Sequence, residues 1–315
     1  MNRVALVGTG VVGSSWSLVF ARAGADVNIY DPDRASAGRV VDYVRSALSA
    51  PEAPKSAAGG DSETILSRLK IVPSLEEAVA GVDYIQESAP ERLDVKKELY
   101  KRLDAAANPS AILASSTSGL PASSFTEGLE HRQRCLVVHP INPPHLIPLV
   151  EIVPAPWTAP DVVDRAIDLM REVNQSPIRL RREINGFVVN RLQSAILGEA
   201  FRLVEDGICD ANEVDLAISD GLGLRWFFMG PFETIDLNAP AGVRDYVERY
   251  ESIYSNIFES VQWRADWTGP ALDAIEAERR AALPADRLVE RQAWRDRRLM
   301  ALAAHKRRAN SEIGR

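Results

Sequence analysis

The stretch that decides the fold lies at the start of the chain, where residues 4–31 are VALVGTGVVGSSWSLVFARAGADVNIYD. Residues 4–7 form a short, continuous apolar run, which predicts a buried strand. After the glycines, apolar residues recur at helical spacing from Trp16 to Ala23, and Gly24 ends that helix. A second strand is expected over 26–30. The segment therefore predicts a β-α-β unit, the beginning of a doubly wound parallel sheet.

The turn between the first strand and the helix has the pattern G-x-G-x-x-G, with glycines at 8, 10 and 13. Gly8 permits a tight turn, Gly10 lets a pyrophosphate approach the backbone, and Gly13 lets the helix pack against the strand. The amino end of the helix then faces the phosphates. The alternative is a purely structural turn, but the strand before the turn and the helix after it favour a dinucleotide site.

An acidic residue at the end of the second predicted strand sharpens this prediction. Asp31 lies eighteen residues beyond Gly13, where a carboxylate accepts hydrogen bonds from the adenosine ribose and repels a 2′-phosphate. Asp31 thus predicts NAD as the cofactor. Arg34, three residues further on, leaves NADP open, and Asp31 alone would also be consistent with a simple capping role.

The rest of the first half continues the same pattern. Further strands are expected over 84–86, 111–114 and 135–138, with a helix from Leu93 to Ala107. The segment from Ala50 to Asp61 is rich in Pro, Ala and Gly and predicts a loop inside this domain. Residues 1–185 are therefore expected to form one Rossmann-type α/β domain.

Beyond this point the predicted structure is helical. Amphipathic patterns cover 188–204, 212–220, 241–262 and 272–304. The fold class is thus a doubly wound sheet domain followed by an all-helical C-terminal domain over 186–315. A substrate cleft is expected between the two domains.

Composition excludes several classes of protein. The net charge is −7, and the one basic cluster, 306–308, is expected to be a solvated helix end, so we expect no nucleic-acid partner. Cys135 and Cys209 form no C-x-x-C motif, which argues against a disulfide framework or a metal site. No signal peptide and no apolar run of about 20 residues is present, so we expect a cytoplasmic protein that does not bind membranes.

Polar residues that follow predicted strands are candidates for catalysis, because ligands bind beyond the carboxyl ends of strands in such sheets. They are the run Ser115 to Ser118, His139 before a proline turn, and Glu151, which closes the apolar stretch 149–150. Histidine has a pKa suited to accept a hydroxyl proton while a hydride leaves for NAD. A carboxylate on its other nitrogen, such as Glu151, would fix the tautomer. From the residues alone, a lone histidine before a proline turn is more often structural than catalytic.

Several motifs resemble one family over nearly the whole chain. The sequence resembles the 3-hydroxyacyl-CoA dehydrogenase superfamily, and most closely its lambda-crystallin or L-gulonate 3-dehydrogenase branch. The motifs that carry the resemblance are the glycine loop with Asp31, ERLDVKKELYKRLD at 91–104, Ser115 to Ser118, HPINPP at 139–144 with PLVE at 148–151, GFVVNRLQ at 186–193, GLGLRWFFMGPFETIDLNA at 221–239 and RQAWRDRRLM at 291–300.

The resemblance implies roles for individual catalytic residues. His139 would be the general base, paired with Glu151, while Ser118 and Asn190 would hold the reacting oxygen of the substrate. Ser118 could instead cap a turn, with a preceding serine in its place. Asn190 could instead cap a helix.

The resemblance also implies further cofactor contacts. The amides of Val11 and Val12 would bind the pyrophosphate, and Asn142 would lie near the nicotinamide. Glu91 and Lys96 would lie beside the cofactor, although they could also form an ordinary solvated helix start.

The substrate is expected to be a small hydroxy carboxylic acid. Arg225, in the run 223–226, could clamp its carboxylate bidentately, or could be a structural arginine. L-gulonate, oxidised to 3-dehydro-L-gulonate, is the favoured substrate. Alternatives are a 3-hydroxyacyl-CoA thioester, a carnitine dehydrogenase-like activity, or a non-catalytic, crystallin-like NAD-binding protein. Two features depart from the branch: His145 stands where a tyrosine is common, and Glu183-Ile184-Asn185 replaces a more apolar lead before GFVVN.

The resemblance implies a homodimer joined through the helical domain. The apolar residues of Ile253 to Val261 could supply the interface, or could be core within the domain.

Overall fold

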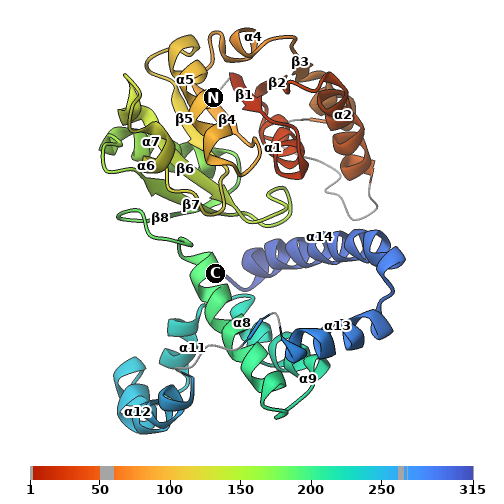
Figure 1. Cartoon of the computed structure of the whole chain (residues 1–315), viewed down its shortest axis with the longest axis vertical. Coiled ribbons are helices and arrows are strands. Elements are labelled where there is room, and N and C mark those ends of the chain that lie inside the picture. The colour runs from red at the N-terminus through yellow and green to blue at the C-terminus, as the bar shows by residue number, and fades with distance from the viewer. Residues whose placement is uncertain (1–2, 50–59, 262–265, 268, 315) are drawn as a thin grey trace. The chain divides into compact units, whose positions relative to one another are not determined.

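One sheet organises the first half of the molecule, with the strand order β3-β2-β1-β4-β5-β6-β7-β8 (Figure 1). The computed structural model describes residues 3–49, 60–261, 266–267 and 269–314. The strands are β1 (Arg3–Val7), β2 (Asp26–Tyr30), β3 (Leu69–Ile71), β4 (Tyr84–Glu87), β5 (Ile112–Ser115), β6 (Cys135–Pro140), β7 (Leu149–Pro154) and β8 (Ser176–Arg179).

Strands β1 to β6 are parallel. The order in which strands are added to the sheet reverses at β1, which pairs with β2 on one side and β4 on the other. This order confirms the predicted doubly wound sheet. The carboxyl ends of β1 and β4 therefore form the point where ligands bind in such sheets.

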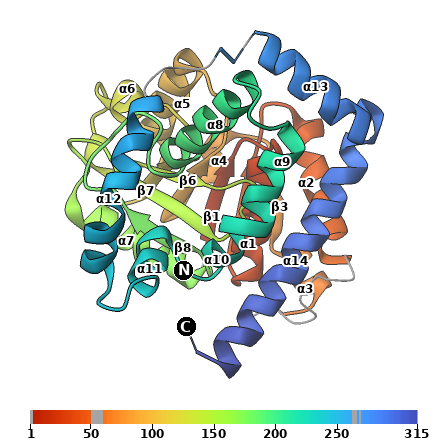
Figure 2. The same cartoon turned by 90° about the horizontal axis from the view of Figure 1, so that it is seen from below.

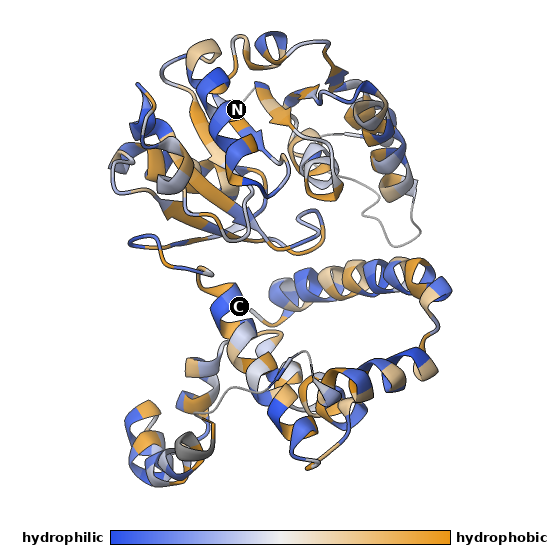
Figure 3. Ribbon diagram, in the orientation of Figure 1, coloured by the Kyte–Doolittle hydropathy of each residue, from blue (hydrophilic) through white to orange (hydrophobic). Residues whose placement is uncertain are grey.

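Helices cover both faces of this sheet. The helices of this half are α1 (Val11–Arg22), α2 (Arg34–Ser49), α3 (Ser62–Ser67), α4 (Leu75–Val79), α5 (Leu93–Ala106), α6 (Ser123–Thr126) and α7 (Pro160–Glu172), with a 3₁₀ turn at Arg132–Arg134. Helices α1, α2, α3 and α7 pack with the side chains of one sheet face. Helices α4, α5 and α6 pack with the other. Figure 3 shows the strands as the most hydrophobic elements, as expected for a sheet buried on both sides.

The direction of β7 corrects one expectation. Glu151 does not close a strand: it is the third residue of β7, which continues to Pro154 and runs antiparallel to β6. The reason is the short connection, because residues 141–148 are too few for the crossover that a parallel neighbour requires. The strands β3, β7 and β8 were not predicted. Only the apolar stretch 149–150 marked β7, while β3 and β8 are three and four residues long and β8 contains a proline.

The second half is helical, as expected. Its elements are α8 (Val189–Glu205), α9 (Ala211–Leu216), a π-helix (Ala217–Leu222), α10 (Gly223–Trp226), α11 (Pro231–Leu237), α12 (Val243–Ser260), α13 (Pro270–Ala282), a 3₁₀ turn (Ala285–Arg287) and α14 (Leu288–Glu312). The helical pattern expected over 272–304 comprises two helices, because α13 ends before Pro284 and the 25-residue α14 begins after it (Figure 2).

The chain divides into two compact units. The sheet unit comprises Met1–Val188 with Asp296–Arg315, and the helical unit comprises Val189–Arg295. The expected boundary at 185/186 lies three residues before the observed one. The expected helical domain over 186–315 is corrected at its end, where the last part of α14 groups with the sheet unit. The loop predicted over 50–61 lies, except for Gly60 and Asp61, outside the described residues.

Candidate active site

The glycine loop between β1 and α1 has the geometry of a phosphate-binding turn. Gly8 has a φ of +98°, and a Cβ there would lie 2.5 Å from the carbonyl oxygen of Ser88 at the end of β4. A Cβ on Gly13 would lie 2.0 Å from the carbonyl oxygen of Gly8. Only glycine fits at these two positions, which is why the strand and the helix can approach so closely.

The amino end of α1 is prepared for an anion. Gly10 is the N-cap residue, provides no side-chain cap, and has nothing within 4 Å of the position its Cβ would take. The first turn of α1, which begins with Val11 and Val12, carries no acidic residue. Uncapped amides at a helix start attract phosphate. These residues therefore fit the pyrophosphate of NAD, which supplies a hydride acceptor when bound.

Asp31 fixes this loop directly. Its Oδ2 accepts hydrogen bonds from the backbone N–H and the hydroxyl of Thr9, at 2.8 and 2.7 Å. Its Oδ1 accepts the N–H of Asp33 at 2.9 Å. The carboxylate is partly exposed, so it holds the glycine loop and also presents an edge at the end of β2. Its contact with the ribose stays a prediction.

A buried ion pair lies at the carboxyl ends of β4 and β5. Lys96 of α5 is 1% exposed and donates to both carboxylate oxygens of the fully buried Glu87, at 2.8 and 3.0 Å. Ser115 donates to Glu87 at 2.6 Å, and the backbone N–H of Ala89 donates at the same distance. The alternative that Lys96 belongs to a solvated helix start is therefore wrong. Removing one partner of such a pair would leave a buried charge uncompensated.

Sequence reasoning missed Glu87. The signal that could have found it is the acidic residue at the end of an otherwise buried strand, nine residues before Lys96.

Glu91 connects this pair to the turn that carries Ser118. Its Oε2 lies 3.7 Å from Lys96 Nζ. Its Oε1 accepts the hydroxyl of Thr117 at 2.5 Å and the backbone amides of Ser118 and Gly119, both at 3.1 Å. Partial burial by itself raises the pKa of Glu91, but these hydrogen bonds and the charge of Lys96 outweigh it and hold the pKa below its ordinary value. An ionised Glu91 thus orders the turn.

Burial and bonding distinguish the serines of the run 115–118. Ser115 is bound to Glu87, and the hydroxyl of Ser116 accepts from Gln86 at 2.7 Å and from the indole of Trp16 at 3.2 Å. The hydroxyls of Ser115 and Ser116 are thus both used in hydrogen bonds within the sheet unit. Ser118 is exposed at the carboxyl edge of the sheet. This arrangement favours Ser118 over the preceding serines as the residue that reaches a substrate.

The central feature of the edge is the pair formed by His139 and Glu151. The two residues lie opposite each other in the antiparallel register of β6 and β7, and His139 Nδ1 is 2.7 Å from Glu151 Oε2. Their side chains are 5% and 0% exposed. A carboxylate accepts only, so Nδ1 carries the proton, and in the neutral imidazole the lone pair is on Nε2. The arrangement is that of an oriented general base.

The second oxygen of Glu151 holds the chain at the end of the sheet unit. Glu151 Oε1 accepts the backbone N–H of Val188 at 2.7 Å. The preceding Phe187 is fully buried, has a φ of +50°, and packs its ring 5.4 Å from the ring of His139. A bulky residue in this backbone region persists only where its surroundings determine it. The imidazole is therefore fixed by Glu151 on one side and Phe187 on another.

The remaining predicted site residues divide between the two units. Asn142 lies exposed in the loop after β6, in the sheet unit. Asn190 is the second residue of α8 in the helical unit, inside the helix and not at its cap. Arg225 is half-buried in α10, directly after the π-helix, and makes no ion pair within the described part of the chain. Within the sheet unit, the structure joins His139 to Glu151 and joins Glu91 to Lys96 and the turn of Ser118. The roles of all these residues, and of Asn190 and Arg225, stay predictions.

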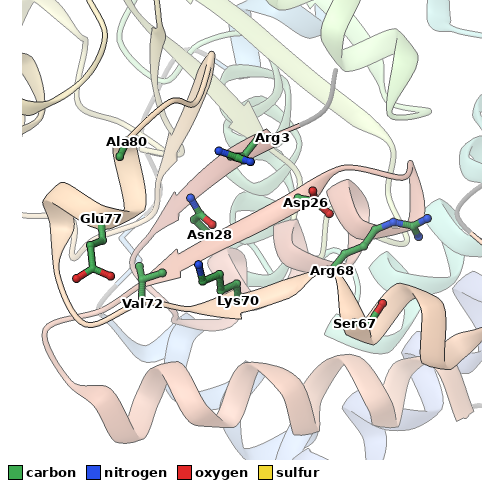
Figure 4. A pocket seen from close by; sticks show the side chains of 9 residues that line it. All are labelled: Arg3, Asp26, Asn28, Ser67, Arg68, Lys70, Val72, Glu77 and Ala80. Atoms are coloured by element: carbon green, nitrogen blue, oxygen red, sulfur yellow. The ribbon is translucent and has the colours of Figure 1, made fainter.

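A separate cavity of about 400 Å³ lies at the other end of the sheet (Figure 4). It is lined by residues of β1, β2 and β3, of the chain on either side of β3, and of α4 and its C-cap: Arg3, Asp26, Asn28, Ser67, Arg68, Lys70, Val72, Glu77 and Ala80. It does not include any of the site residues described above.

The doubly wound sheet, the uncapped glycine loop and the histidine–glutamate pair define a class of protein, the dinucleotide-dependent dehydrogenases. The chain matches the model of the 3-hydroxyacyl-CoA dehydrogenase NAD-binding domain over residues 3–184 and that of the C-terminal domain over 186–268. The chain therefore belongs to the 3-hydroxyacyl-CoA dehydrogenase family, and its cofactor is NAD.

Relatives of known name support this assignment. The chain is 41% identical over 307 residues to lambda-crystallin of Oryctolagus cuniculus, with 96% of each chain covered. It is 43% identical over 247 residues to L-carnitine dehydrogenase of a Pseudomonas species, with 78% of this chain and 76% of the other covered.

A solved structure shares the fold. The 5-formyl-3-hydroxy-2-methylpyridine 4-carboxylic acid 5-dehydrogenase, described as an NAD+-dependent dismutase, superposes with a TM-score of 0.79 at 27% identity, covering 96% of this chain and 97% of the other.

Within the described residues, no helix is long and apolar enough to cross a membrane.

Proposed function

We propose that this protein oxidises the 3-hydroxyl group of a small hydroxy carboxylic acid with NAD. The observation that carries the proposal is the 2.7 Å pair of His139 and Glu151 at the carboxyl edge of the sheet. His139 Nε2 takes the hydroxyl proton while the C–H hydride leaves for the cofactor, and the carbon–oxygen double bond forms. Glu151 stabilises the resulting imidazolium. The hydroxyl of Ser118 and the amide of Asn190 donate to the developing carbonyl oxygen.

A free carboxylic acid is favoured over a thioester. Arg225 is half-buried and without an ion pair among the described residues, so its guanidinium is available for a bidentate contact with a carboxylate. The relative named L-carnitine dehydrogenase has a substrate of this class in its name. L-gulonate is the favoured substrate because the motifs of the chain resemble the lambda-crystallin or L-gulonate 3-dehydrogenase branch of the family.

The alternative enzyme is a 3-hydroxyacyl-CoA dehydrogenase, which the family name favours. A non-catalytic, crystallin-like NAD-binding protein is a further alternative. The oriented His139–Glu151 pair argues against it, because a purely structural protein does not need an imidazole with one nitrogen left open for a proton.

One set of assays tests the proposal. NADH formation is followed in parallel with L-gulonate, L-carnitine, 3-hydroxybutyrate and 3-hydroxybutyryl-CoA. We expect the highest kcat/KM with a free acid and the highest of all with L-gulonate. Preference for the thioester would show that the protein is a 3-hydroxyacyl-CoA dehydrogenase instead. No turnover with any of the four compounds would favour a non-catalytic NAD-binding protein.

We also propose that the protein acts as a homodimer joined through the helical unit. Five apolar residues of α12 recur at spacings of four and three and are exposed in the single chain: Val243, Val247, Tyr250, Tyr254 and Ile257. Ile253 is exposed as well, so the expected alternative of core within the domain is not supported for this part of Ile253 to Val261. A continuous stripe of this kind is typical of a helix that packs against another helix.

A further inference from the structure

The loop of residues 141–148, which joins β6 to β7, is tied to the cofactor-binding helix at its tip. Its base is closed by the backbone bond from Ile141 N to Leu149 O at 3.3 Å. The amides of Leu146 and Ile147 both donate to Pro143 O at 3.0 Å, so the loop is ordered internally as well. Asn142, at the start of the loop, is followed by two buried prolines with fixed φ angles. A constraint at the tip is therefore transmitted to Asn142.

The tie at the tip is a reciprocal pair of hydrogen bonds between His145 and Ser15 of α1. The backbone N–H of His145 donates to Ser15 Oγ at 3.1 Å, and Ser15 Oγ lies 2.7 Å from His145 Nδ1. Since the hydroxyl accepts the amide, its own proton is free to donate to Nδ1. This requires an imidazole without a proton on Nδ1. We call these two bonds the Ser15–His145 clasp.

The surroundings of His145 favour that neutral imidazole. Burial is the main cause that lowers the pKa of His145 to about 4, and the positive charge of Arg22 on α1 lowers it further, whereas Asp296 of α14 opposes the shift. From α2, the Tyr43 hydroxyl lies 3.4 Å from Nδ1, and its ring packs edge-on against the imidazole with centroids 5.9 Å apart. The clasp is thus intact at neutral pH.

We propose that the Ser15–His145 clasp positions Asn142 for the nicotinamide half of the cofactor. This rests on the proposed function only in that the nicotinamide accepts the hydride there, and the place of Asn142 beside it is what the family resemblance implies. Ser15 is fully buried in the second turn of α1, so α1 holds the pyrophosphate at its amino end and the β6–β7 loop at its side. Ser15 and His145 touch neither substrate nor reacting atoms and are positioning residues.

A positioning role for the clasp can be distinguished from a merely structural one by comparing the affinities for NADH and for ADP-ribose. ADP-ribose occupies only the half of the site formed by the glycine loop and Asp31, whereas NADH also needs the β6–β7 loop. Loss of the clasp is therefore expected to weaken NADH binding and to leave ADP-ribose binding unchanged. Two hydrogen bonds of ordinary strength predict a loss of about tenfold in NADH affinity.

The test is a double-mutant cycle on the full-length protein, with NADH and ADP-ribose affinities measured by calorimetry. The variants are Ser15→Ala, His145→Leu and their combination. His145→Asn is the rescue variant, because its side-chain oxygen can take the place of Nδ1. Ser17→Ala is the matched control: Ser17 is equally buried on α1, but its hydroxyl bonds only to Gly13 O of the same helix, at 3.1 Å.

We expect Ser15→Ala, which breaks both bonds, and the double variant to lose NADH affinity by about the same factor of ten. His145→Leu keeps the backbone N–H that donates to Ser15 Oγ and should lose about threefold. His145→Asn and Ser17→Ala should bind NADH as the wild type does. Unchanged NADH affinity, equal losses for NADH and ADP-ribose, additive losses, or no rescue by asparagine would each overturn the proposal. None of these readouts needs a substrate, so a failure of the proposed oxidation would leave the result standing.

Discussion

The sheet unit and the helical unit bury their apolar side chains to very different extents. Two clusters of fully buried residues flank the sheet, with Trp16, Phe20, Tyr84 and Tyr100 at less than 2% exposure. In the described part of the helical unit, the buried residues are all small: Ala211, Thr234, Ala239 and Ala271. Figure 3 shows hydrophobic and hydrophilic residues interleaved along α12.

This difference indicates that the sheet unit provides the site and that the helical unit provides an interface. The sheet unit has its own core and can hold a preorganised site, since each group around His139 is fixed by a buried partner. A helix with an exposed apolar stripe must bury it against another element. The helical unit is therefore expected to depend on a partner surface, whereas the sheet unit is not.

The largest effect is expected in the sheet unit, at His139. His139→Ala removes the group that accepts the hydroxyl proton and should lower kcat by at least about 100-fold. NAD affinity should stay within about twofold, because the glycine loop and Asp31 are untouched. Steady-state kinetics and calorimetry on the same preparation check both. His305→Ala, an exposed histidine of α14, is the matched control. Unchanged turnover in His139→Ala would exclude the base role.

The next effect is expected in the helical unit, on association. Val247→Glu places a charge in the middle of the apolar stripe of α12 and should weaken dimerisation by about 30-fold, which corresponds to about 2 kcal/mol. Ser252→Glu adds the same charge to an exposed position of the same helix outside the stripe. Sedimentation equilibrium measures the dissociation constants. Equal constants for the two variants would show that this stripe is not the interface.

A smaller effect is expected at the cofactor end of the sheet unit. Asp31→Ala should weaken the discrimination against NADP by about tenfold, since the carboxylate no longer repels the 2′-phosphate. Asp31→Asn separates charge from loop anchoring, because its oxygen can still accept from Thr9. The ratio of dissociation constants for NAD and NADP is measured, with Asp33→Asn as the control. A ratio that stays unaltered in both Asp31 variants would count against the ribose contact.

The same comparison explains what could be predicted from the sequence. The glycine loop and the first strands are local features, in which a few adjacent residues determine the conformation, and these predictions are confirmed. Asp31 follows β2 as expected, and its contact with the ribose stays a prediction. The position of Glu151 depended on the direction of β7, which the eight-residue connection 141–148 determines and the apolar pattern does not. The contact of Ser15 with His145 joins residues 130 positions apart, and no local pattern marks it.

The helical unit was harder to predict for another physical reason. Amphipathic periodicity located α8 and α12, but the same periodicity continues through Pro284 and through the π-helix Ala217–Leu222, where the backbone departs from the α-helix. At Gly223 a Cβ would lie 2.7 Å from the carbonyl oxygen of Ile218, so the glycine permits that departure. A hydrophobic pattern reports which face is buried, and not where the hydrogen-bond register changes.

The smallest expected effect is on the pH dependence of stability, and it arises at His145 in the sheet unit. Its pKa in the folded protein is about 4, below the ordinary value of 6.5. As the pH falls through 6.5, the unfolded chain takes up a proton that the folded protein refuses. The stability contribution is therefore present in full above pH 6.5 and is lost as the pH falls towards 4.

His145→Asn cannot titrate and keeps an acceptor for Ser15, so it removes this loss without removing the clasp. We expect the melting temperature of the variant, relative to the wild type, to rise by about 2 °C between pH 7 and pH 5. Calorimetric melts at both pH values measure the difference, and the many carboxylates that titrate in this range cancel because both proteins contain them. A difference in melting temperature that stays constant with pH would show that His145 titrates normally in the folded protein, with its imidazole open to solvent.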